Sequence, residues 1–254
     1  MIFYFSGTGN SRHIARHIAR LTSDSAQDIC NTTLTPTDDT RIGLIFPVHA
    51  WHAPTIYQQF IEQKLRNLVC HASPYIYMIA TCGDDIGKTE ELTTRLLNSI
   101  GLQLSAAFSL IMPDSYIGLP GFDVNSEEVE LRKVSAALTL LPEIAADINA
   151  HRNVRRTKPG PFPWTKSHVL RPLFYKYFTG PRLFSTTDTC IACKRCADIC
   201  PTKNITFKDR RPQWGDRCTN CLACYHICPK HSIVFGKFSK AKGQYQLLLD
   251  KQEV

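Results

Sequence analysis

The segment Ile2-Phe-Tyr-Phe-Ser-Gly-Thr-Gly-Asn-Ser11 places an apolar run directly before a loop of glycines and hydroxyl side chains. The run Ile2–Phe5 predicts a buried strand, and Ser11–Leu21 carries its apolar residues on one helical face. A loop between such a strand and helix lies at the carboxyl end of the strand, where glycines let backbone amides approach an anion. The segment therefore predicts the first strand, loop and helix of an α/β fold, with a loop in which a phosphate would fit.

The chain continues this alternation of strands and helices to about residue 148. One short strand is expected before Cys30. The other expected strands are Ile42–Phe46, Tyr75–Ala80 and Ser105–Ile111, and the expected helices are Thr55–Leu65, Thr89–Ile100 and Asn125–Ile148. Such alternation, with right-handed crossovers, predicts a doubly wound parallel sheet of five strands. Ligands of these sheets bind at the carboxyl ends of the strands, where the strand order reverses.

The loop Ser6–Ser11 departs from two common nucleotide-binding patterns. No lysine follows it as in a P-loop, and Arg12 occupies the last glycine position of the Gly-x-Gly-x-x-Gly pattern. Taken alone, a loop of this composition is more often a turn or a helix cap. Two loops expected at the same edge favour a phosphate site instead. They are Pro47-Val-His-Ala-Trp-His52 after the third strand and Thr81-Cys-Gly-Asp-Asp85 after the fourth.

With these three loops, residues 1–150 resemble the flavodoxins, in which a Ser/Thr-x-Thr-Gly-Asn-Ser/Thr loop holds the phosphate of FMN and the next two loops enclose the isoalloxazine ring. The resemblance implies a flavodoxin-like fold with FMN as its cofactor. The implied FMN-binding residues are Ser6, Gly7, Thr8, Gly9, Asn10, Ser11, Pro47, Val48, His49, Ala50, Trp51, Thr81, Cys82, Gly83 and Asp84.

Trp51 would lie against the flavin ring, because an indole offers a large apolar face for stacking. The third loop has no aromatic side chain, whereas many flavodoxins supply one there, so we expect the flavin to be more open on that side. Cys82 is read as a small residue in a tight turn. His49 and His52 are either solvated or hydrogen-bonded to the flavin edge, where they would respond to pH.

Eight of the eleven cysteines form two copies of one pattern, offset by 28 residues. In the pattern Cys-x-x-Cys-x-x-Cys-x-x-x-Cys-Pro, three closely spaced thiolates hold one [4Fe–4S] cluster and the fourth ligates the neighbouring cluster. We therefore expect Cys190, Cys193, Cys196 and Cys228 to hold one cluster, and Cys218, Cys221, Cys224 and Cys200 to hold the other. Zinc is the alternative for such thiolates, but a zinc site uses two pairs of ligands and needs no Cys-Pro ending.

The formal charge of +8 is unevenly distributed, with −6 on residues 1–150, +7 on 151–189 and +7 on 190–254. Five prolines and a surplus of Lys and Arg predict a basic linker over residues 151–185. Within it, the apolar spacing of Val169–Phe178 predicts a short docked amphipathic helix. Residues 186–254 would then form a small α+β ferredoxin domain with a C-terminal tail.

This order of domains is similar to a family of flavodoxin–ferredoxin fusion proteins, whose chain closes with a basic segment containing Gly and Tyr, as in Lys240–Tyr245. The resemblance implies electron transfer between two [4Fe–4S] clusters and FMN, which would convert between one-electron and two-electron chemistry. Redox partner proteins are expected, and the motifs identify neither donor nor acceptor.

Two other functions remain open at this point. One is an oxidoreductase that uses FMN to reduce a small molecule or a partner's flavin, although no Ser/His/Asp triad or NAD fingerprint supports a substrate site. The other is nucleic-acid or membrane-surface binding by the basic segment 151–189, which lacks the context of known nucleic-acid readers. We expect no nucleic-acid partner and no membrane span, and the apolar start after Met1 without a basic leader predicts a cytoplasmic protein.

Overall fold

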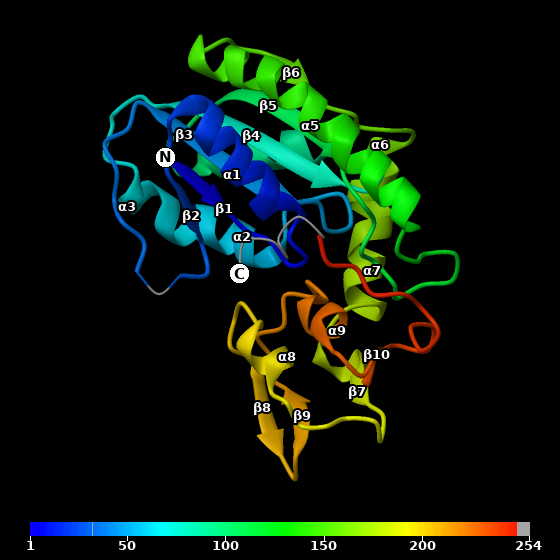
Figure 1. The fold of residues 1–254 in the computed structure, drawn as a ribbon. Coiled ribbons are helices and arrows are strands. Elements are labelled where there is room, and N and C mark those ends of the chain that lie inside the picture. Colours follow the sequence, from blue (N-terminus) through cyan, green and yellow to red (C-terminus); the bar gives the residue numbers. More distant parts are fainter. Residues whose placement is uncertain (32, 248–254) are drawn as a thin grey trace. The chain divides into compact units, whose positions relative to one another are not determined.

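The computed structural model describes residues 1–31 and 33–247, which divide into two compact units (Figure 1). The first unit contains Met1–Ser6, Asn10–Pro113 and Glu127–Arg171, and the second contains Gly7–Gly9, Asp114–Ser126 and the chain from Pro172 onward. The expected linker 151–185 is thus divided between the units at Arg171. No helix of the described residues combines the length and apolar character needed to cross a lipid bilayer.

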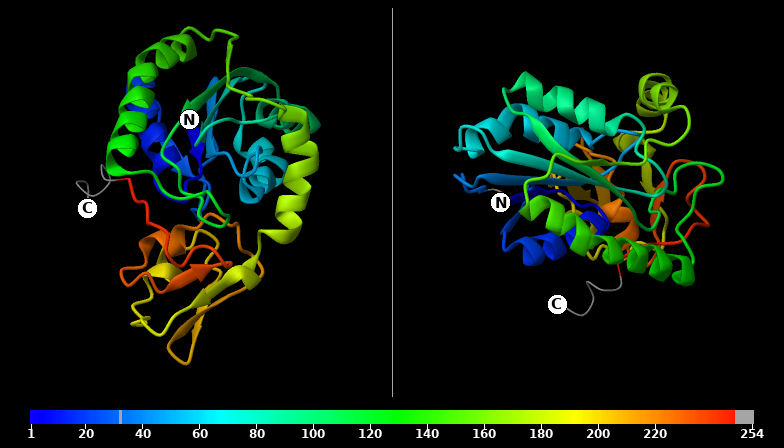
Figure 2. Two further views of the ribbon diagram at one scale, coloured as in Figure 1. Left: turned by 90° about the vertical axis from the view of Figure 1, so that its right-hand side faces the viewer. Right: turned by 90° about the horizontal axis from the view of Figure 1, so that it is seen from above.

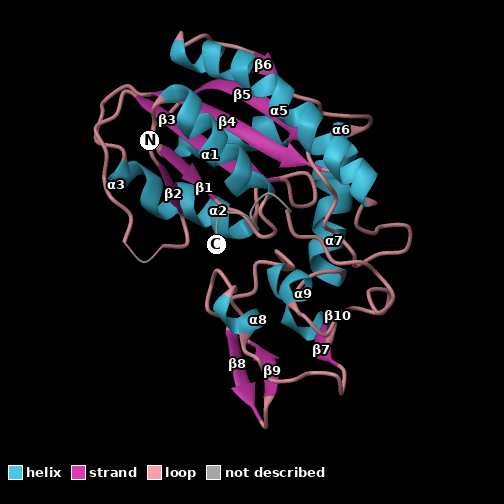
Figure 3. Cartoon of the chain, viewed as in Figure 1, coloured by secondary structure: helices cyan, strands magenta, loops and turns pink. Residues whose placement is uncertain are grey.

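The first unit is built on a six-stranded sheet in the order β2-β1-β3-β4-β5-β6, and every neighbouring pair is parallel (Figure 3). The strands are β1 (Ile2–Tyr4), β2 (Ala26–Asp28), β3 (Arg41–Pro47), β4 (Tyr75–Cys82), β5 (Leu104–Ile111) and β6 (Arg155–Arg156). All eight residues of β4 are buried, as expected for a parallel strand covered on both faces. The order reverses at β1, which lies between β2 and β3. The doubly wound parallel α/β fold predicted from the sequence is confirmed.

Helices cover both faces of this sheet (Figure 2). On one face α1 (Asn10–Thr22) packs against α5 (Glu127–Asn149). The other face carries α4 (Thr89–Ser99) and a continuous helical segment made of α2 (Thr55–Phe60), the π-helical turn η1 (Ile61–Leu65) and α3 (Arg66–Leu68). The buried residues of α1 recur three and four positions apart, which is why this helix forms where the apolar pattern predicts it.

The sheet has one strand more than the five predicted. The sixth strand consists of Arg155 and Arg156, whose side chains are exposed and ion-paired to helices of the same unit. Arg155 Nε lies 3.1 Å from Glu90 Oε1, and Arg156 Nη2 lies 3.0 Å from Oδ2 of the buried Asp147. Two charged residues have no hydrophobic period, so the strand leaves no local signal and depends on these distant partners.

A helical segment follows, formed by α6 (Pro163–Thr165), the π-helical turn η2 (Lys166–Leu170) and α7 (Arg171–Tyr177). It begins six residues before the predicted helix Val169–Phe178. The apolar side chains that predicted the helix are about half exposed, at 41% for Val169 and 48% for Leu173. Its contacts within the first unit come instead from Lys166 and Ser167.

The second unit is a small α+β domain, as predicted for the C-terminal part of the chain. After the single turn η3 (Pro181–Leu183), β7 (Phe184–Thr186) pairs antiparallel with β10 (Ile233–Phe235), and β8 (Ile205–Lys208) pairs with β9 (Arg211–Trp214). Two short helices, α8 (Arg195–Asp198) and α9 (Ala223–Ile227), lie between these strands in sequence. The core residues are Ile117, Phe184, Cys196, Ile205, Leu222, Cys224, Tyr225, Cys228, Ile233 and Phe235. Ile117 comes from Asp114–Ser126, which the sequence assigned to the first domain.

Candidate functional site

The three predicted flavin loops follow β1, β3 and β4, whose carboxyl ends lie at the same edge of the sheet because the strands are parallel. The first loop runs from Ser6 to Gly9, where φ is +103°, and α1 begins directly after it at Asn10. This φ lies in the left-handed region that glycine adopts without strain. Loop amides and the start of a helix therefore follow one another here, as a phosphate site requires.

Two predicted phosphate ligands make hydrogen bonds inside the first unit. The buried Asn10 side chain donates from Nδ2 to Pro113 O at 3.0 Å. The hydroxyl of Ser11, which is fully buried, lies 2.8 Å from the Thr81 hydroxyl. The Ser11–Thr81 bond joins the start of α1 to the end of β4, next to the first and third loops, and the half-buried Ser6 and Thr8 lie before it in the chain.

The second loop makes a tight turn at its tip. His49 N donates to His52 O at 2.8 Å and His52 N donates to His49 O at 3.3 Å, while the two residues between them are left-handed. Their φ values are +46° for Ala50 and +59° for Trp51. Non-glycine residues in this region cost about 1–3 kcal/mol each and cluster at functional sites. Pro47 and Val48 lead into the turn, with Val48 N donating to Thr81 O at 2.8 Å.

Trp51 is held in this strained turn by residues that are distant in sequence. Its carbonyl accepts a hydrogen bond from Ser167 Oγ at 3.2 Å, and Lys166 Nζ lies 5.8 Å from the centre of its ring. A Cβ on Gly87, where φ is +54°, would lie 2.6 Å from Trp51 Cβ and 2.7 Å from Ser167 Oγ. The backbone of Gly87 therefore closes the space beneath the half-exposed indole.

His49 and His52 are neutral near pH 7. Burial lowers the pKa of His49 to about 4. Burial and the positive charge of Arg171 lower the pKa of His52 to about 3. His52 Nδ1 accepts a hydrogen bond from Ala53 N at 2.7 Å, which places the ring proton of the neutral form on Nε2. The His52 side chain is buried, whereas His49 keeps part of its surface exposed.

The third loop is held by three lysines that the sequence reading missed. Lys133 Nζ donates to Gly83 O at 3.2 Å, and Lys158 Nζ lies 3.0 Å from Oδ1 of the exposed Asp84. Lys166 makes a short ion pair with the buried Asp85. The buried Cys82 precedes these contacts, with its Sγ 3.7 Å from Leu110 O. The lysines lie 50 to 81 residues further along the chain than the residues they contact, so no local sequence pattern predicts these contacts.

In the second unit, the two cysteine repeats share an unusual backbone conformation at matching positions. Three non-glycine residues of each repeat are left-handed, with φ between +47° and +63°. They are Ala192, Lys194 and Lys203 in the first repeat, and Asn220, Leu222 and His231, each 28 residues later, in the second. The backbone conformation is therefore repeated together with the sequence. Both copies contain strained left-handed residues where the chain wraps around its thiols.

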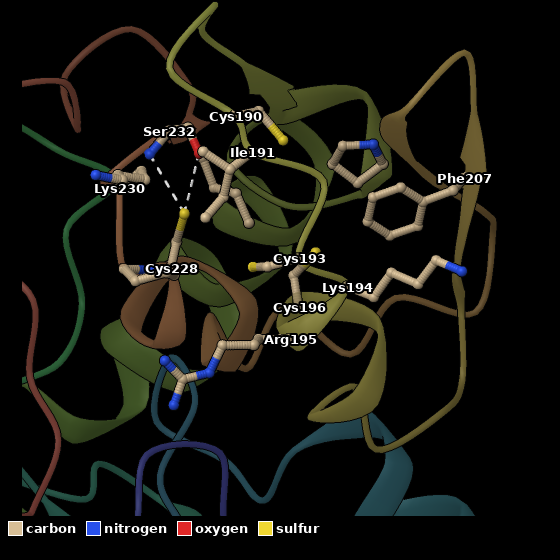
Figure 4. Close-up of a pocket in the computed structure, with 13 residues that line it drawn as sticks. Cys190, Ile191, Cys193, Lys194, Arg195, Cys196, Phe207, Cys228, Lys230 and Ser232 are labelled. Atoms are coloured by element: carbon tan, nitrogen blue, oxygen red, sulfur yellow. Dashed lines mark hydrogen bonds between the residues drawn. The ribbon is translucent and has the colours of Figure 1, made fainter.

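A pocket of the second unit is lined by Cys190, Cys193, Cys196 and Cys228, the four thiols predicted to hold the first cluster. Figure 4 shows Cys228 of the second repeat beside the three cysteines of the first. The other lining residues are apolar or basic, apart from Ser232. They are Ile191, Lys194, Arg195, Phe207, Pro212, Pro229, Lys230 and Ile233.

The loop after Cys228 directs hydrogen bonds to the Cys228 sulfur. Ser232 donates to Cys228 Sγ from its backbone N at 3.4 Å, and its hydroxyl lies 3.1 Å from the same sulfur (Figure 4). Burial raises the pKa of Cys228, but hydrogen bonds from the Ser232 hydroxyl and from the amides of Lys230, Ser232 and Ile233 outweigh burial and lower it. By contrast, burial raises the pKa of Cys196 to about 11. The loop after Cys228 thus stabilises a thiolate at this position.

The other four predicted ligands also influence one another. Burial raises the pKa of Cys218 to about 11 and raises those of Cys221 and Cys224, and repulsion from Cys200 adds to all three effects. The nearby Trp214 side chain acts on the pKa of Cys224 in the opposite direction. Cys200 of the first repeat is therefore close enough to act on three cysteines of the second.

Contacts outside the cysteine pattern hold α9 in place. The buried His226 accepts a hydrogen bond from Tyr245 N at its Nδ1, at 3.0 Å, and its Nε2 lies 2.8 Å from Ser115 O. Burial lowers the pKa of His226 to about 4, so the ring is neutral with its proton on Nε2. The Tyr225 hydroxyl donates to Lys242 O at 2.8 Å. The basic C-terminal segment is thereby packed against the helix that carries Cys224.

The donor set fits an iron–sulfur centre. Four thiols line one pocket together with apolar and basic residues, and amide and hydroxyl groups surround the Cys228 sulfur, as is typical of cluster ligands. Within residues 1–31 and 33–247, no three His, Cys, Asp or Glu side chains converge to hold a single metal ion. For FMN, the fit rests on the glycine loop at the start of α1 and on the strained turn that presents Trp51.

Residues 182–229 match the family model described as a 4Fe-4S dicluster domain, so the chain carries a domain of the 4Fe–4S type. No curated protein matches the sequence. Among solved structures, rubredoxin oxygen:oxidoreductase from Desulfovibrio gigas is 13% identical, with a TM-score of 0.36, and the match covers 59% of this chain and 36% of that one. Trp repressor binding protein from Bacillus subtilis is 14% identical, with a TM-score of 0.36, over 56% of this chain and 95% of that one. Both likenesses are too distant to bear on function.

Proposed function

We propose that this chain is an electron-transfer iron–sulfur flavoprotein that passes electrons between two [4Fe–4S] clusters and FMN. In this proposal residues 186–254 carry the clusters, and the strand-end loops of residues 1–150 carry FMN. A flavin exchanges one or two electrons and each cluster exchanges one, so the protein would convert between the two kinds of redox chemistry.

The pocket lined by Cys190, Cys193, Cys196 and Cys228 carries the proposal. These thiols would hold the first cluster, and the matching set that includes Cys200 would hold the second. Cluster ligands must be deprotonated, and the raised pKa of Cys196 means that iron binding releases protons at neutral pH. The pKa of Cys228 is lowered, which favours its thiolate form, because Ser232 and nearby amides donate to it.

The flavin half of the proposal rests on the first two loops. Ser6, Thr8 and the amides of the glycine loop would bind the phosphate, and the Ser11–Thr81 hydrogen bond would hold the first loop against the third. Trp51 would contact the ring from its strained turn. His49 and His52 would influence the flavin only as neutral hydrogen-bonding groups, because their pKa values lie near 4 and 3.

The test is anaerobic purification followed by measurement of iron, sulfide, zinc and flavin per chain. About eight iron atoms, eight sulfides and one FMN are expected. Iron without flavin would contradict the flavin half of the proposal, and zinc in place of iron would contradict the clusters. Chelation of the iron should unfold the second unit, because a small domain with so few core residues depends on its metal centres.

Paired variants separate the sites. Cys193→Ser should lose iron, whereas Cys70→Ser changes an exposed cysteine of the first unit and should keep all of it. Trp51→Ala should weaken FMN binding, whereas Trp164→Ala changes an indole that is 59% exposed and should not. Equal iron contents in the two cysteine variants, or equal FMN affinities in the two tryptophan variants, would contradict the corresponding assignment.

A further inference from the structure

Because the two cysteine loops share one sequence pattern, their surroundings can be compared position by position. Positions 191, 194 and 195 of the first repeat correspond to 219, 222 and 223 of the second. In the first repeat they are Ile191, which is 52% exposed, and two exposed cations, Lys194 and Arg195. In the second, Leu222 and Ala223 are each 4% exposed. The first loop faces solvent at positions 194 and 195, where the second is buried, and Thr219, the counterpart of Ile191, is half-buried.

One pair of thiols follows the same division. Cys193 is exposed, and its counterpart Cys221 is half-buried. An electron exchanged with a separate protein must cross the gap between two redox centres, so the centre at the exposed loop is the better placed of the two. Of the two cysteine loops, the one that includes Cys193 is therefore the more accessible to a partner.

The cations around this pocket have no partner in the described part of the chain. Lys194, Arg195 and Lys230 line the pocket and make no ion pair with any residue in 1–31 or 33–247. Figure 4 shows their side chains extending away from the cysteine sulfurs on different sides of the pocket. Asp198 is the one acidic residue between Cys190 and Cys200. In the first unit, by contrast, Lys158 and Lys166 are paired with aspartates.

We propose that the surface formed by Ile191, Lys194, Arg195 and Lys230 docks an acidic electron-carrier protein. An exposed apolar side chain among unpaired cations has the arrangement of a small interface, with an apolar centre and a charged rim. Opposite charge on the partner would steer it to the pocket and raise the rate of encounter. One electron leaves the reduced centre of one protein and enters the oxidised centre of the other, and no bond forms or breaks.

This proposal rests on the clusters proposed above, and the test uses the loaded full-length protein. The probe is an acidic [2Fe–2S] ferredoxin, mixed anaerobically with the protein in a stopped-flow spectrophotometer in the downhill direction. The second-order rate constant should fall as salt is raised from 20 to 200 mM, because salt screens the attraction between the two surfaces. The Debye length is ~10 Å at 0.1 M. A rate constant that is independent of salt would overturn the proposal without any substitution.

Charge reversal locates the surface. Lys194→Glu, Arg195→Glu and Lys230→Glu together should lower the rate constant at 20 mM salt by about tenfold or more. The control reverses the same number of exposed cations elsewhere in the second unit, with Lys208→Glu, Lys237→Glu and Lys240→Glu. Equal rate constants for the two variants would place docking elsewhere and overturn the assignment.

Iron content and the visible spectrum are measured on every sample. If the wild-type protein holds no iron, the proposed function itself fails. If it holds iron and exchanges electrons with the probe, but the two triple variants behave alike, only the docking surface fails. If the first triple variant loses iron, the salt dependence of the wild-type protein decides the question alone.

Discussion

The hydroxyl of Ser232 lies 3.1 Å from Cys228 Sγ, and its removal gives a direct prediction about the electrochemistry of the protein. Ser232→Ala deletes this group and keeps the backbone N–H, which donates to the same sulfur at 3.4 Å. A hydrogen bond to a ligand sulfur stabilises the reduced cluster more than the oxidised one, because the reduced form is more negative. The substitution should therefore lower the reduction potential of the cluster held by Cys228.

The size of the shift follows from the strength of one hydrogen bond. A side-chain hydrogen bond contributes about 0.5–1.5 kcal/mol net. Since about 1.4 kcal/mol is a factor of ten, and a factor of ten is about 59 mV for one electron, the potential should fall by about 20–60 mV. The first repeat offers a matched case, because the hydroxyl of Thr202 lies 3.6 Å from Cys200 Sγ. Thr202→Val should cause a smaller shift, since that contact is longer.

The assay is an anaerobic redox titration followed by electron paramagnetic resonance, with Ser185→Ala on an exposed position of β7 as the control. Ser232→Ala and Thr202→Val should move different waves, because Cys228 and Cys200 are assigned to different clusters. If both variants moved the same wave, the crossed ligand assignment would be refuted. If Ser232→Ala moved neither wave, the hydroxyl would have no part in setting the potential.

Three further predictions concern the first unit. The pKa of His52 is about 3 in the folded protein and about 6.5 in the unfolded chain, so its stabilising effect is complete above pH 6.5 and is lost on acidification. Urea titrations at pH 6.5 and 5 should differ by about 2 kcal/mol more in the wild type than in His52→Gln. Lys166→Met leaves the Asp85 carboxylate buried without its partner and should lower the free energy of unfolding by about 3 kcal/mol. Adding Asp85→Asn should restore much of this stability. A double variant no more stable than the single one would argue against the ion pair. Gly87→Ala places a Cβ against Trp51 and should raise the Kd for FMN about tenfold in a fluorescence titration, whereas an unchanged Kd would separate Trp51 from the flavin.

Most of the first unit was predictable from local pattern. The apolar runs and helical faces gave elements such as β3 and α4 to within a residue or two of their observed bounds, because these elements are amphipathic or fully buried. The segment 151–171 was not predictable in this way. Its prolines and basic residues have the composition of a linker, yet Arg155, Arg156 and Lys166 are each paired with acidic residues of earlier elements.

The candidate site also combines features that the sequence predicts with contacts that it does not. The cysteine spacing and the glycine loop are local motifs, so they point to their chemistry without any knowledge of the fold. The groups that hold those motifs in place are distant in sequence, as with Ser167 on Trp51 and Ser115 on His226. Hydrogen bonds between residues more than 100 positions apart have no sequence signature, which is why these residues were found only in the structure.

The pocket that contains Cys193 also includes Cys228, and this has a consequence for how the protein is made in the cell. A ribosome releases the chain from its amino terminus, so the first three cysteines emerge well before the fourth. With the crossed ligand assignment proposed above, no complete ligand set would exist until the second repeat has left the exit tunnel. Cofactor insertion would therefore be a late, nearly simultaneous event for both centres, and a nascent or truncated chain ending before Cys228 would expose unfinished thiols to oxidation.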